Sequence, residues 1–231
     1  MTRPGMLSII VPCLNEAEGV GATLAALAPL RARGAELIVV DGGSRDGTAE
    51  RAAPLADLVL TAPRGRASQM NAGAARARGE ILLFLHADTR LPEGADALVV
   101  EGLERARRGW GRFDVTIAGA HPLLRVVERL MNLRSRLTGI ATGDQAIFVT
   151  KSLFDAVGGY PDIPLMEDIE LSARLKRYGP PLCLGQRVVT SGRRWERHGV
   201  ARTILLMWRL RLAYWAGADP AELALRYYEN R

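Results

Sequence analysis

Cysteine is scarce in this sequence, with two residues among 231. Cys13 and Cys183 lie far apart, form no CxxC pair and have no cluster of histidines nearby, which argues against a zinc site and against a disulfide framework. The apolar run that ends at Pro12 is too short for the hydrophobic region of a signal peptide. We therefore expect a protein of the reducing cytoplasm, without an export signal.

The sequence also contains no apolar run long enough to cross a bilayer. Its most apolar late segment, 203–216, carries Arg209 and Arg211 and falls short of the roughly 20 residues that a membrane helix needs. Lysine is nearly absent, since 29 of the 31 basic residues are arginine, and the formal net charge is +6. This charge could favour phosphate-bearing ligands or an anionic membrane surface, but a skewed genomic base composition would produce the same arginine content. The net charge therefore does not by itself decide which kind of ligand or surface the protein binds.

Strand-like and helix-like segments alternate through the first part of the chain. Continuously apolar runs, typical of strands with both faces buried, are separated by segments with helical periodicity. The expected strands are 7–11, 36–40, 57–60 and 81–85, and the expected helices are 16–33, a segment from about 47, and 67–78. Such alternation predicts an α/β fold with a central, mostly parallel sheet flanked by helices.

The second part of the chain is less regular. We expect helices at 93–108 and 167–178, strands at 113–117, 146–150 and 182–190, a basic amphipathic segment at 122–137, and C-terminal helices at 200–216 and 220–228. No internal repeat or low-complexity linker divides the sequence. The length is that of one domain, so we expect a single domain over 1–231.

Three of the expected strands end in polar clusters, at 12–16, 41–48 and 86–89. Ligands of open parallel sheets bind beyond the carboxyl ends of the strands, so we expect these clusters to face one crevice. The glycine-rich turn after Asp41 permits close approach to a ligand but lacks the GxGxxG spacing of dinucleotide folds. Asp46 is the exception in this turn, because an Asp at that place is better explained as a cap of the next helix.

Six motifs resemble, in order and spacing, those of family-two inverting glycosyltransferases. They are the segments 10–16, 41–48, 65–73, 85–89, 166–168 and 193–195, and the resemblance covers about residues 7–200. It implies a GT-A fold with a nucleotide-sugar-binding half over 1–118, an acceptor and catalytic half over 119–200, and C-terminal helices over 201–231. The donor-binding residues that the resemblance implies are Pro12, Glu16, Asp41, Arg66, His86, Ala87, Asp88 and Arg194.

The residue types suit those roles, although alternatives remain. Asp41 can accept from a base N–H or a ribose hydroxyl, and Arg66 can stack on the base or pair with phosphate. The alternative for Arg66 is a solvated residue at a helix start. Arg194 offers a positive charge to the donor diphosphate.

The metal motif departs from the family pattern, because the family's Asp-x-Asp is replaced by His86-Ala87-Asp88. Asp88 is in the register of the metal-coordinating member, and His198 resembles the histidine that completes the metal shell in many GT-A enzymes. The resemblance therefore implies manganese or magnesium bound by Asp88 and His198. His86 could accept from a ribose hydroxyl through a neutral ring nitrogen, or it could simply pack. A short bacterial subgroup of the family shares this replacement.

The acidic motif supplies the expected catalytic base. Asp168 resembles the family's general base and Glu167 its neighbour in the acceptor site, although acidic residues also occur at helix starts for electrostatic reasons alone. Asp144 and Gln145 precede an expected strand and could contribute to the acceptor site. Trp195 could be either a sugar platform or a core residue.

The sequence thus predicts an inverting, metal-dependent transfer of a sugar from a nucleotide diphosphate to a hydroxyl acceptor. A nucleotidyltransferase is one alternative, but it usually has a Gly-rich basic loop where this chain has 12–16. A non-catalytic basic module is the other, although aromatic residues make up only 6% of the chain and no nucleic-acid motif is present, so we expect no nucleic-acid partner.

Two basic amphipathic segments, 122–137 and 203–216, suggest a surface for partners. The first carries four arginines, Arg125, Arg129, Arg134 and Arg136, among leucines and valines. Such segments suit weak, salt-sensitive contact with an anionic membrane or a lipid-linked acceptor. Alternatively, the two segments pack on each other or form a homodimer interface.

Overall fold

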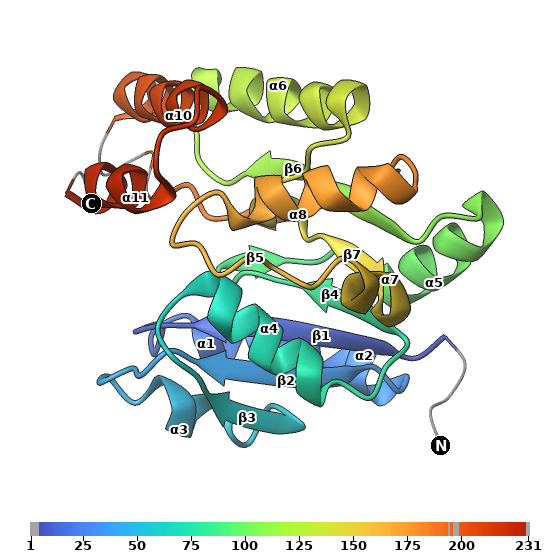
Figure 1. The fold of residues 1–231 in the computed structure, drawn as a ribbon. Helices are drawn as coiled ribbons and strands as arrows, with labels where there is room; N and C mark the ends of the chain where they lie inside the picture. The colour runs from blue at the N-terminus through green and yellow to red at the C-terminus, as the bar shows by residue number, and fades with distance from the viewer. Residues whose placement is uncertain (1–4, 194, 196–198, 230–231) are drawn as a thin grey trace.

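A mixed sheet of eight strands forms the centre of the structure, a computed structural model that describes residues 5–193, 195 and 199–229 (Figure 1). The strand order is β3-β2-β1-β4-β7-β6-β8-β5. The strands are β1 Leu7–Cys13, β2 Glu36–Asp41, β3 Leu58–Thr61, β4 Ile81–Phe84, β5 Thr89–Arg90, β6 Trp110–Ile117, β7 Phe148–Thr150 and β8 Leu182–Thr190. Strands β3, β2, β1 and β4 are parallel, as the sequence predicts, whereas β7 is antiparallel to both of its neighbours.

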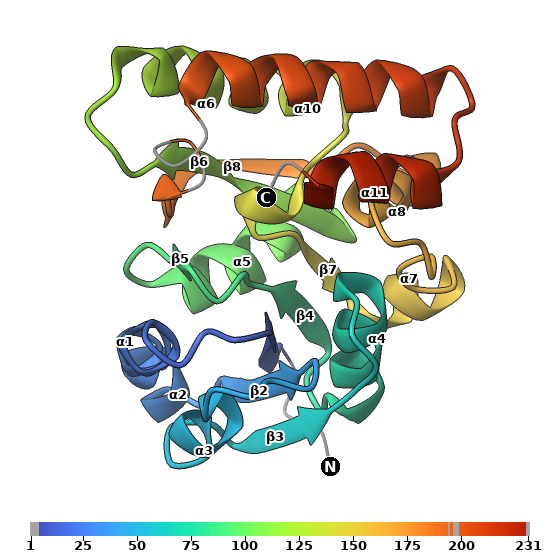
Figure 2. The same cartoon turned by 90° about the vertical axis from the view of Figure 1, so that its left-hand side faces the viewer.

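Helices cover both faces of this sheet (Figure 2). They are α1 Val20–Ala26, α2 Ala28–Ala32, α3 Thr48–Ala52, α4 Arg66–Arg76, α5 Ala95–Ala106, α6 Pro122–Thr138, α7 Lys151–Ala156, α8 Glu167–Leu175, α10 Val200–Trp215 and α11 Pro220–Glu229, with short 3-10 turns η1 Gly143–Gln145 and η2 Lys176–Tyr178. Alternate strand residues point to opposite faces, so Ile9 packs with α1, α3 and α5, while its neighbour Ile10 packs with α4, α7 and α8. Strand β1 therefore contributes to two cores.

The expected helix over 16–33 is wrong as a single element. The chain forms two short helices, α1 and α2, that meet at Leu27. Pro29 lies at the start of α2 and has no backbone N–H, so it cannot continue the hydrogen-bond ladder of α1. Helix α7 and the two-residue strand β5 were not expected from the sequence.

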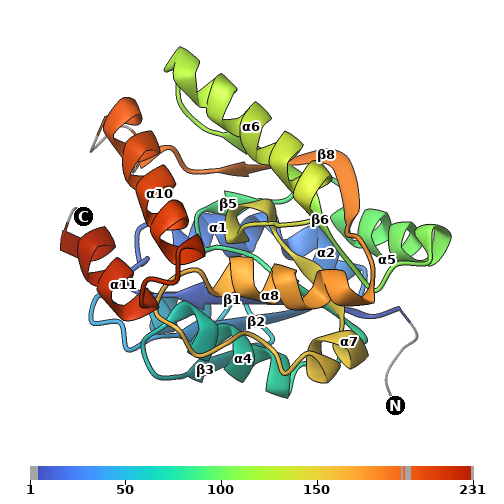
Figure 3. The same cartoon turned by 45° about the horizontal axis from the view of Figure 1, so that its top comes forward.

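Helices α6 and α10 form a further layer over the second half of the sheet, and α11 packs beneath α10 (Figures 2 and 3). The first of them, α6, is fixed to β6 by buried polar contacts. Asn132 donates to Val115 O at 3.0 Å and accepts from Val115 N at 2.9 Å, and Glu128 accepts from Ile117 N at 3.1 Å. No helix within the described residues is long and apolar enough to cross a bilayer.

Candidate active site

The loops that follow β1 and β2 are hydrogen-bonded to each other. Asn15 N donates to Ser44 Oγ at 2.8 Å, and Glu16 N donates to Thr48 Oγ1 at 2.9 Å. Asp46 accepts from the Thr48 hydroxyl, from Ala17 N at 3.0 Å and from Thr48 N at 3.1 Å, and these bonds hold the pKa of Asp46 below its usual value. Asp46 thus binds the first residue of α3, as a structural role predicts, although the N-cap position itself is Gly47.

Asp41 lies at the end of β2, and its side chain is buried. One carboxylate oxygen accepts from Gly43 N and Ser44 N, both at 2.9 Å, and the other accepts from the Ser44 hydroxyl. The carboxylate thus shapes the turn that it begins. Pro12 lies on the adjacent strand, paired with Val40, so the two expected donor residues lie at the same edge of the sheet.

Gln69 holds these two strand ends together, a role that sequence reasoning missed. Its side-chain amide donates to Cys13 O at 2.8 Å and to Val40 O at 2.7 Å. A Cβ at Gly73, one turn along α4, would lie 2.5 Å from Ile10 Cγ2, so the glycine allows the helix to approach β1 closely. The sequence feature that could have revealed this role is a polar residue among the apolar and small residues on the inner face of α4.

Arg66 begins α4, and its guanidinium lies 4.0 Å from the carboxylate of Glu167 at the start of α8. The loop before α8 is tied to α4 by Asn71, which donates to Tyr160 O at 2.8 Å and accepts from Tyr160 N at 2.9 Å. Arg66 was expected in the donor site and Glu167 in the acceptor site. The fold brings these two residues together although they are distant in sequence. Arg66 remains partly exposed, with 41% of its side chain accessible.

Asp168 and His86 meet at the turn η1. Asp168 Oδ2 accepts from Gly143 N at 2.9 Å, and its other oxygen accepts from Ile169 N at 2.7 Å. His86 Nδ1 lies 3.2 Å from Asp144 Oδ1. A Cβ at residue 143 would lie 2.4 Å from His86 Nε2, so only glycine fits beneath the imidazole. The His86 ring therefore packs on the turn as well as facing a carboxylate.

Gln145 and Ala87 are buried and take part in hydrogen bonds that position the backbone of the site. Gln145 is fully buried, and its amide donates to Ser135 Oγ at 3.1 Å and to Asn132 Oδ1 at 3.3 Å, which fixes η1 against α6. Ala87 is also buried, and its carbonyl accepts from Thr23 Oγ1 at 2.6 Å. These two residues hold backbone in place, and their side chains face the interior.

The carboxyl group of Glu167 has a raised pKa. Burial raises its pKa to about 7, and the negative charge of Asp168 adds to the rise, while the positive charge of Arg66 opposes it. Met166, which precedes the pair, has a φ of 70°, a conformation that a residue with a side chain adopts at a cost. Such strain is typical of functional loops, and Asn15 and Ala146 share it.

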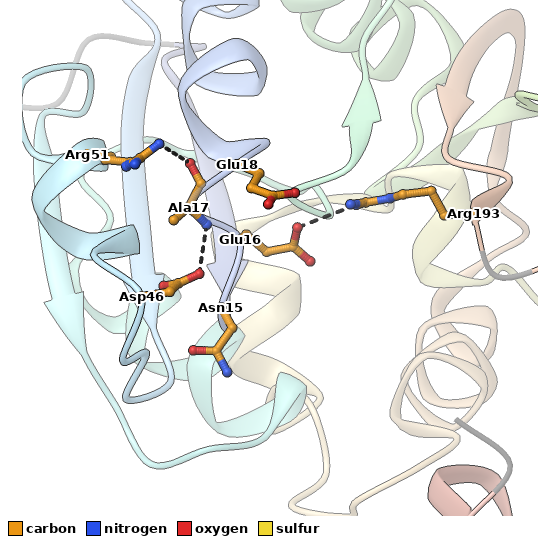
Figure 4. A pocket seen from close by; sticks show the side chains of 7 residues that line it. All are labelled: Asn15, Glu16, Ala17, Glu18, Asp46, Arg51 and Arg193. Atoms are coloured by element: carbon orange, nitrogen blue, oxygen red, sulfur yellow. Dashed lines mark hydrogen bonds and ion pairs between the residues drawn. The ribbon is translucent and has the colours of Figure 1, made fainter. Parts of the chain in front are cut away.

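Asp88 lies near Glu16, and Arg193 lies between the two carboxylates. Arg193 Nη2 lies 3.4 Å from Glu16 Oε2 and 3.9 Å from Asp88 Oδ2, so one cation bridges two expected donor residues. A pocket of about 370 Å³ opens beside this contact (Figure 4). It is lined by Asn15, Glu16, Ala17, Glu18, Asp46, Arg51 and Arg193. Glu16 is the only expected donor residue among these, so the pocket marks one end of the crevice.

The donor atoms at this place partly fit a divalent cation. Asp88 is about one-third exposed and offers hard oxygen atoms, and together with Glu16 it attracts the positive charge of Arg193. Within the described ranges, no cluster of three or more acidic, histidine or cysteine side chains could hold a metal by itself. Oxygen atoms of a bound diphosphate would have to supply further ligands.

The late basic-aromatic motif is described only in part. Arg194 and His198 lie outside the described residues. Trp195 is half-buried and packs against the apolar cluster of Ile117, Leu124 and Val200. Of the two interpretations of Trp195, the structure favours a core contact.

A comparison with known families decides the identity of this arrangement. A family model described as glycosyl transferase family 2 matches residues 8–147, which is more than half of the chain. The chain belongs to glycosyl transferase family 2. The family predicted from the motifs is thereby confirmed, whereas the His-Ala-Asp form of the metal motif stays a prediction. The motifs at 166–168 and 193–195 lie beyond the match, and membership of the short bacterial subgroup stays a prediction.

Relatives of this family-2 chain agree with the match. The probable glycosyltransferase YdaM of Bacillus subtilis (strain 168) is 27% identical over 236 residues, covering 91% of this chain and 54% of the relative. The chain thus spans about half the length of that relative. PcManGT, a mannosyltransferase of Pyrobaculum calidifontis solved with GDP-Man and Mn²⁺, has a TM-score of 0.64 at 24% identity, covering 90% of this chain and 60% of that chain.

A second solved structure, Staphylococcus aureus TarS 1–349 in complex with UDP-GlcNAc, also has a TM-score of 0.64, at 16% identity, covering 80% of this chain and 58% of that chain. At these identities the similarity establishes the fold. The family-2 chain therefore has the GT-A type α/β fold that its motifs imply.

Proposed function

We propose that this chain transfers a sugar from a nucleotide diphosphate to an acceptor hydroxyl, with inversion at the anomeric carbon and with Asp168 as general base. The observation that supports the proposal most is the convergence of Arg66, His86 and Asp168 from three separate elements of a family-2 fold. Glycosyl transfer explains this convergence better than a nucleotidyltransferase or a non-catalytic basic module does.

Asp168 has the geometry that base catalysis needs. General-base catalysis requires a carboxylate oxygen with lone pairs left for the substrate proton. Asp168 is partly exposed, and each of its oxygens accepts one backbone N–H, which leaves a lone pair on each. In the proposed step the acceptor O–H proton moves to Asp168, the acceptor oxygen bonds to the anomeric carbon, and the bond from that carbon to the diphosphate oxygen breaks.

The raised pKa of Glu167 supports Asp168, rather than Glu167, as the general base. Two neighbouring carboxylates rarely ionise together in a buried site, and here the buried Glu167 has the raised pKa of about 7. With this pKa, Glu167 is protonated in roughly half of the molecules at neutral pH. The more exposed Asp168 is left to face the acceptor.

The donor is proposed to lie along the ends of β1, β2 and β4. Pro12 and Asp41 would flank the base, while Arg66 and Arg194 would meet the base or the diphosphate. A manganese or magnesium ion, when bound at Asp88, would neutralise charge on the leaving diphosphate. His198 is the second protein ligand in this proposal.

A thermal-shift screen tests donor binding. The protein would be heated with manganese and each of a panel of nucleotide sugars that includes UDP-GlcNAc and GDP-mannose. Binding to the folded state raises Tm with ligand concentration, so at least one nucleotide sugar is expected to raise it in a manganese-dependent way. A flat response to the whole panel would contradict the proposal.

The outer face of α6 supports a second proposal, that the protein contacts an anionic membrane from one side. The buried positions of α6 are Leu124, Glu128, Asn132 and Ser135, whereas five of its apolar residues form a stripe on the exposed face. The neighbouring α10 exposes a similar stripe. The residues are Leu123, Val126, Leu130, Leu133 and Leu137 of α6, and Leu205, Trp208, Leu212 and Trp215 of α10. Helices with this pattern suit an interface with lipid.

The arginines next to these stripes differ from those expected from the sequence. Arg129 and Arg209 are exposed and remain suitable for anionic headgroups. Arg136 pairs instead with Asp114 at 2.6 Å, and Arg125 binds the carbonyl of Ile117. The membrane contact would thus use fewer arginines than the sequence suggests.

Sedimentation with vesicles tests this contact. Binding to phosphatidylglycerol vesicles is expected to exceed binding to phosphatidylcholine vesicles, to fall with added salt, and to be lost in the double variant Trp208→Ser, Trp215→Ser. Equal recovery with both lipids at low salt would contradict the proposal. A dimer that disappears in the same double variant would assign the stripes to an interface between two copies.

A further inference from the structure

Arg134 of α6 is a partly buried cation that the proposed reaction does not use. Its Nε and Nη2 atoms are inaccessible to solvent and hydrogen-bond to no partner among the described residues. These two nitrogens form the edge of the guanidinium that pairs side-on with a carboxylate or a phosphate. One anion-binding edge of a partly buried guanidinium is therefore left without a partner among the described residues.

Arg112, a fully buried arginine of the same region, provides a contrast. Its Nε also has no hydrogen-bond partner among the described residues, but its Nη1 pairs with Asp114 and its Nη2 donates to Asn132 O at 3.1 Å, so the guanidinium has a counter-ion. Among the ion pairs of the described residues, none includes Arg134, although burial is unfavourable for a cation without a counter-ion. Burial indeed lowers the pKa of Arg134, and the negative charge of Asp168 opposes that shift.

The position of Arg134 connects it to the acceptor side of the crevice. On either side of it in α6, Asn132 and Ser135 hold the side chain of Gln145 in η1. The same turn donates its Gly143 N–H to Asp168. Arg134 thus lies close enough to Asp168 of α8 for the charge of that carboxylate to act on it, although the two form no ion pair.

We infer that Arg134 binds an anionic group of the acceptor, a carboxylate or a phosphate, and so holds the acceptor hydroxyl against Asp168. This inference rests on the proposed glycosyl transfer. The donor diphosphate is a less suitable partner for Arg134, because the diphosphate is proposed to lie at Asp88, where Arg193 already supplies a positive charge. The acceptor would then be a small molecule or headgroup with a hydroxyl near an acidic group.

Binding of three matched probes tests the inference without turnover. Glycerol, D-glycerate and glycerol 3-phosphate differ only in the presence and kind of the anionic group. By calorimetry, the protein should bind at least one of the two anions and not glycerol. Arg134→Gln should weaken anion binding by roughly 10- to 100-fold, because hydrogen bonds to charged groups are lost. Arg134→Lys should restore part of the affinity, since the charge returns without the two-nitrogen edge.

The control variant is Arg105→Gln, which removes an exposed arginine of α5 and should leave anion binding unchanged. Thermal shift with UDP-GlcNAc and GDP-mannose provides the separate readout for the donor. Arg134→Gln should keep the wild-type donor response, which also shows that the variant is folded. If the wild type responds to no nucleotide sugar but still binds the anions through Arg134, the proposed function fails while the anion site stands.

Three outcomes would overturn the inference. They are wild-type affinity for the anions in Arg134→Gln, no binding of either anion by the wild type, and loss of the donor response in Arg134→Gln with anion binding retained. A further arm identifies the source of a phosphate group. Displacement of bound glycerol 3-phosphate by phosphatidylglycerol vesicles would assign a lipid headgroup, and persistence of binding would assign a soluble acceptor.

Discussion

The carboxylate of Asp168 accepts a hydrogen bond of 2.9 Å from the backbone N–H of Gly143. This bond connects the start of α8 to the turn on which His86 packs, so the proposed base and the altered metal motif share one support. The position of Asp168 therefore depends on a residue that has no side chain of its own.

Gly143→Ala should disrupt this support. The added Cβ would lie 2.4 Å from His86 Nε2, and either the imidazole or the turn must move. We expect a loss of about 1–3 kcal/mol of stability, typical of overpacking, together with a fall in kcat. Chemical denaturation and steady-state kinetics would measure the two effects.

Gly21→Ala is the matched control, because nothing lies within 4 Å of a Cβ at this position in α1. It should be neutral or stabilise the protein by up to about 1 kcal/mol, since alanine is the better helix former. Equal stabilities of the two alanine variants would show that the contact between His86 and Gly143 is not tight.

The stability of the protein should depend on pH through Glu167. Its pKa rises from 4.5 in the unfolded chain to about 7 in the folded protein. Between these values the folded state binds more protons than the unfolded state, so the free energy of unfolding falls as pH rises through this window. Glu167→Gln, which cannot lose a proton, should escape this fall and exceed the wild type by on the order of 2 kcal/mol above pH 7.

Urea denaturation across this pH range would measure the difference between the two proteins. Glu104→Gln, an exposed change on α5, should show no comparable trend. Parallel pH profiles for wild type and Glu167→Gln would mean that Glu167 ionises normally in the folded protein.

Asp88→Ala should lose manganese-dependent donor binding. The change removes the one carboxylate left in the metal motif, so donor affinity measured with manganese should fall by at least roughly 10-fold. Without metal the two proteins should bind the donor alike. Asp155→Ala, an exposed change on α7, provides the control, and undiminished metal-dependent affinity in Asp88→Ala would refute the assignment.

Much of the fold follows from local pattern. The buried strands of the first half are continuously apolar, and their parallel pairing needs only the helices between them. The break at Leu27 was also available from the sequence, because Pro29 cannot occupy a helix interior without losing a bond. The antiparallel insertion of β7 could not be predicted from the sequence, since it depends on long-range packing.

The site was predictable to a lesser extent. Motif order brings Arg66, His86 and Asp168 to one crevice, because all follow strands or begin helices at the same edge. The direction of each side chain on α6 could not be predicted in the same way. A helix with leucine stripes ordinarily buries them, whereas α6 turns polar residues toward β6 and with them carries Arg134 inward.

Gln69 and Gly143 show the remaining difficulty. Their roles are to hold strand ends and to admit an imidazole, and both depend on neighbours that are distant in sequence. No local sequence pattern predicts either role.

The most direct test is release of nucleoside diphosphate from nucleotide sugars by the wild type and by Asp168→Asn, measured with manganese and a panel of hydroxyl acceptors that includes glycerol 3-phosphate. The wild type should turn over at least one donor, whereas Asp168→Asn should bind that donor normally and transfer roughly 10²- to 10⁴-fold more slowly, because an amide cannot take the proton. Turnover of the variant at the wild-type rate, or no turnover of any donor that the wild type binds, would contradict the account.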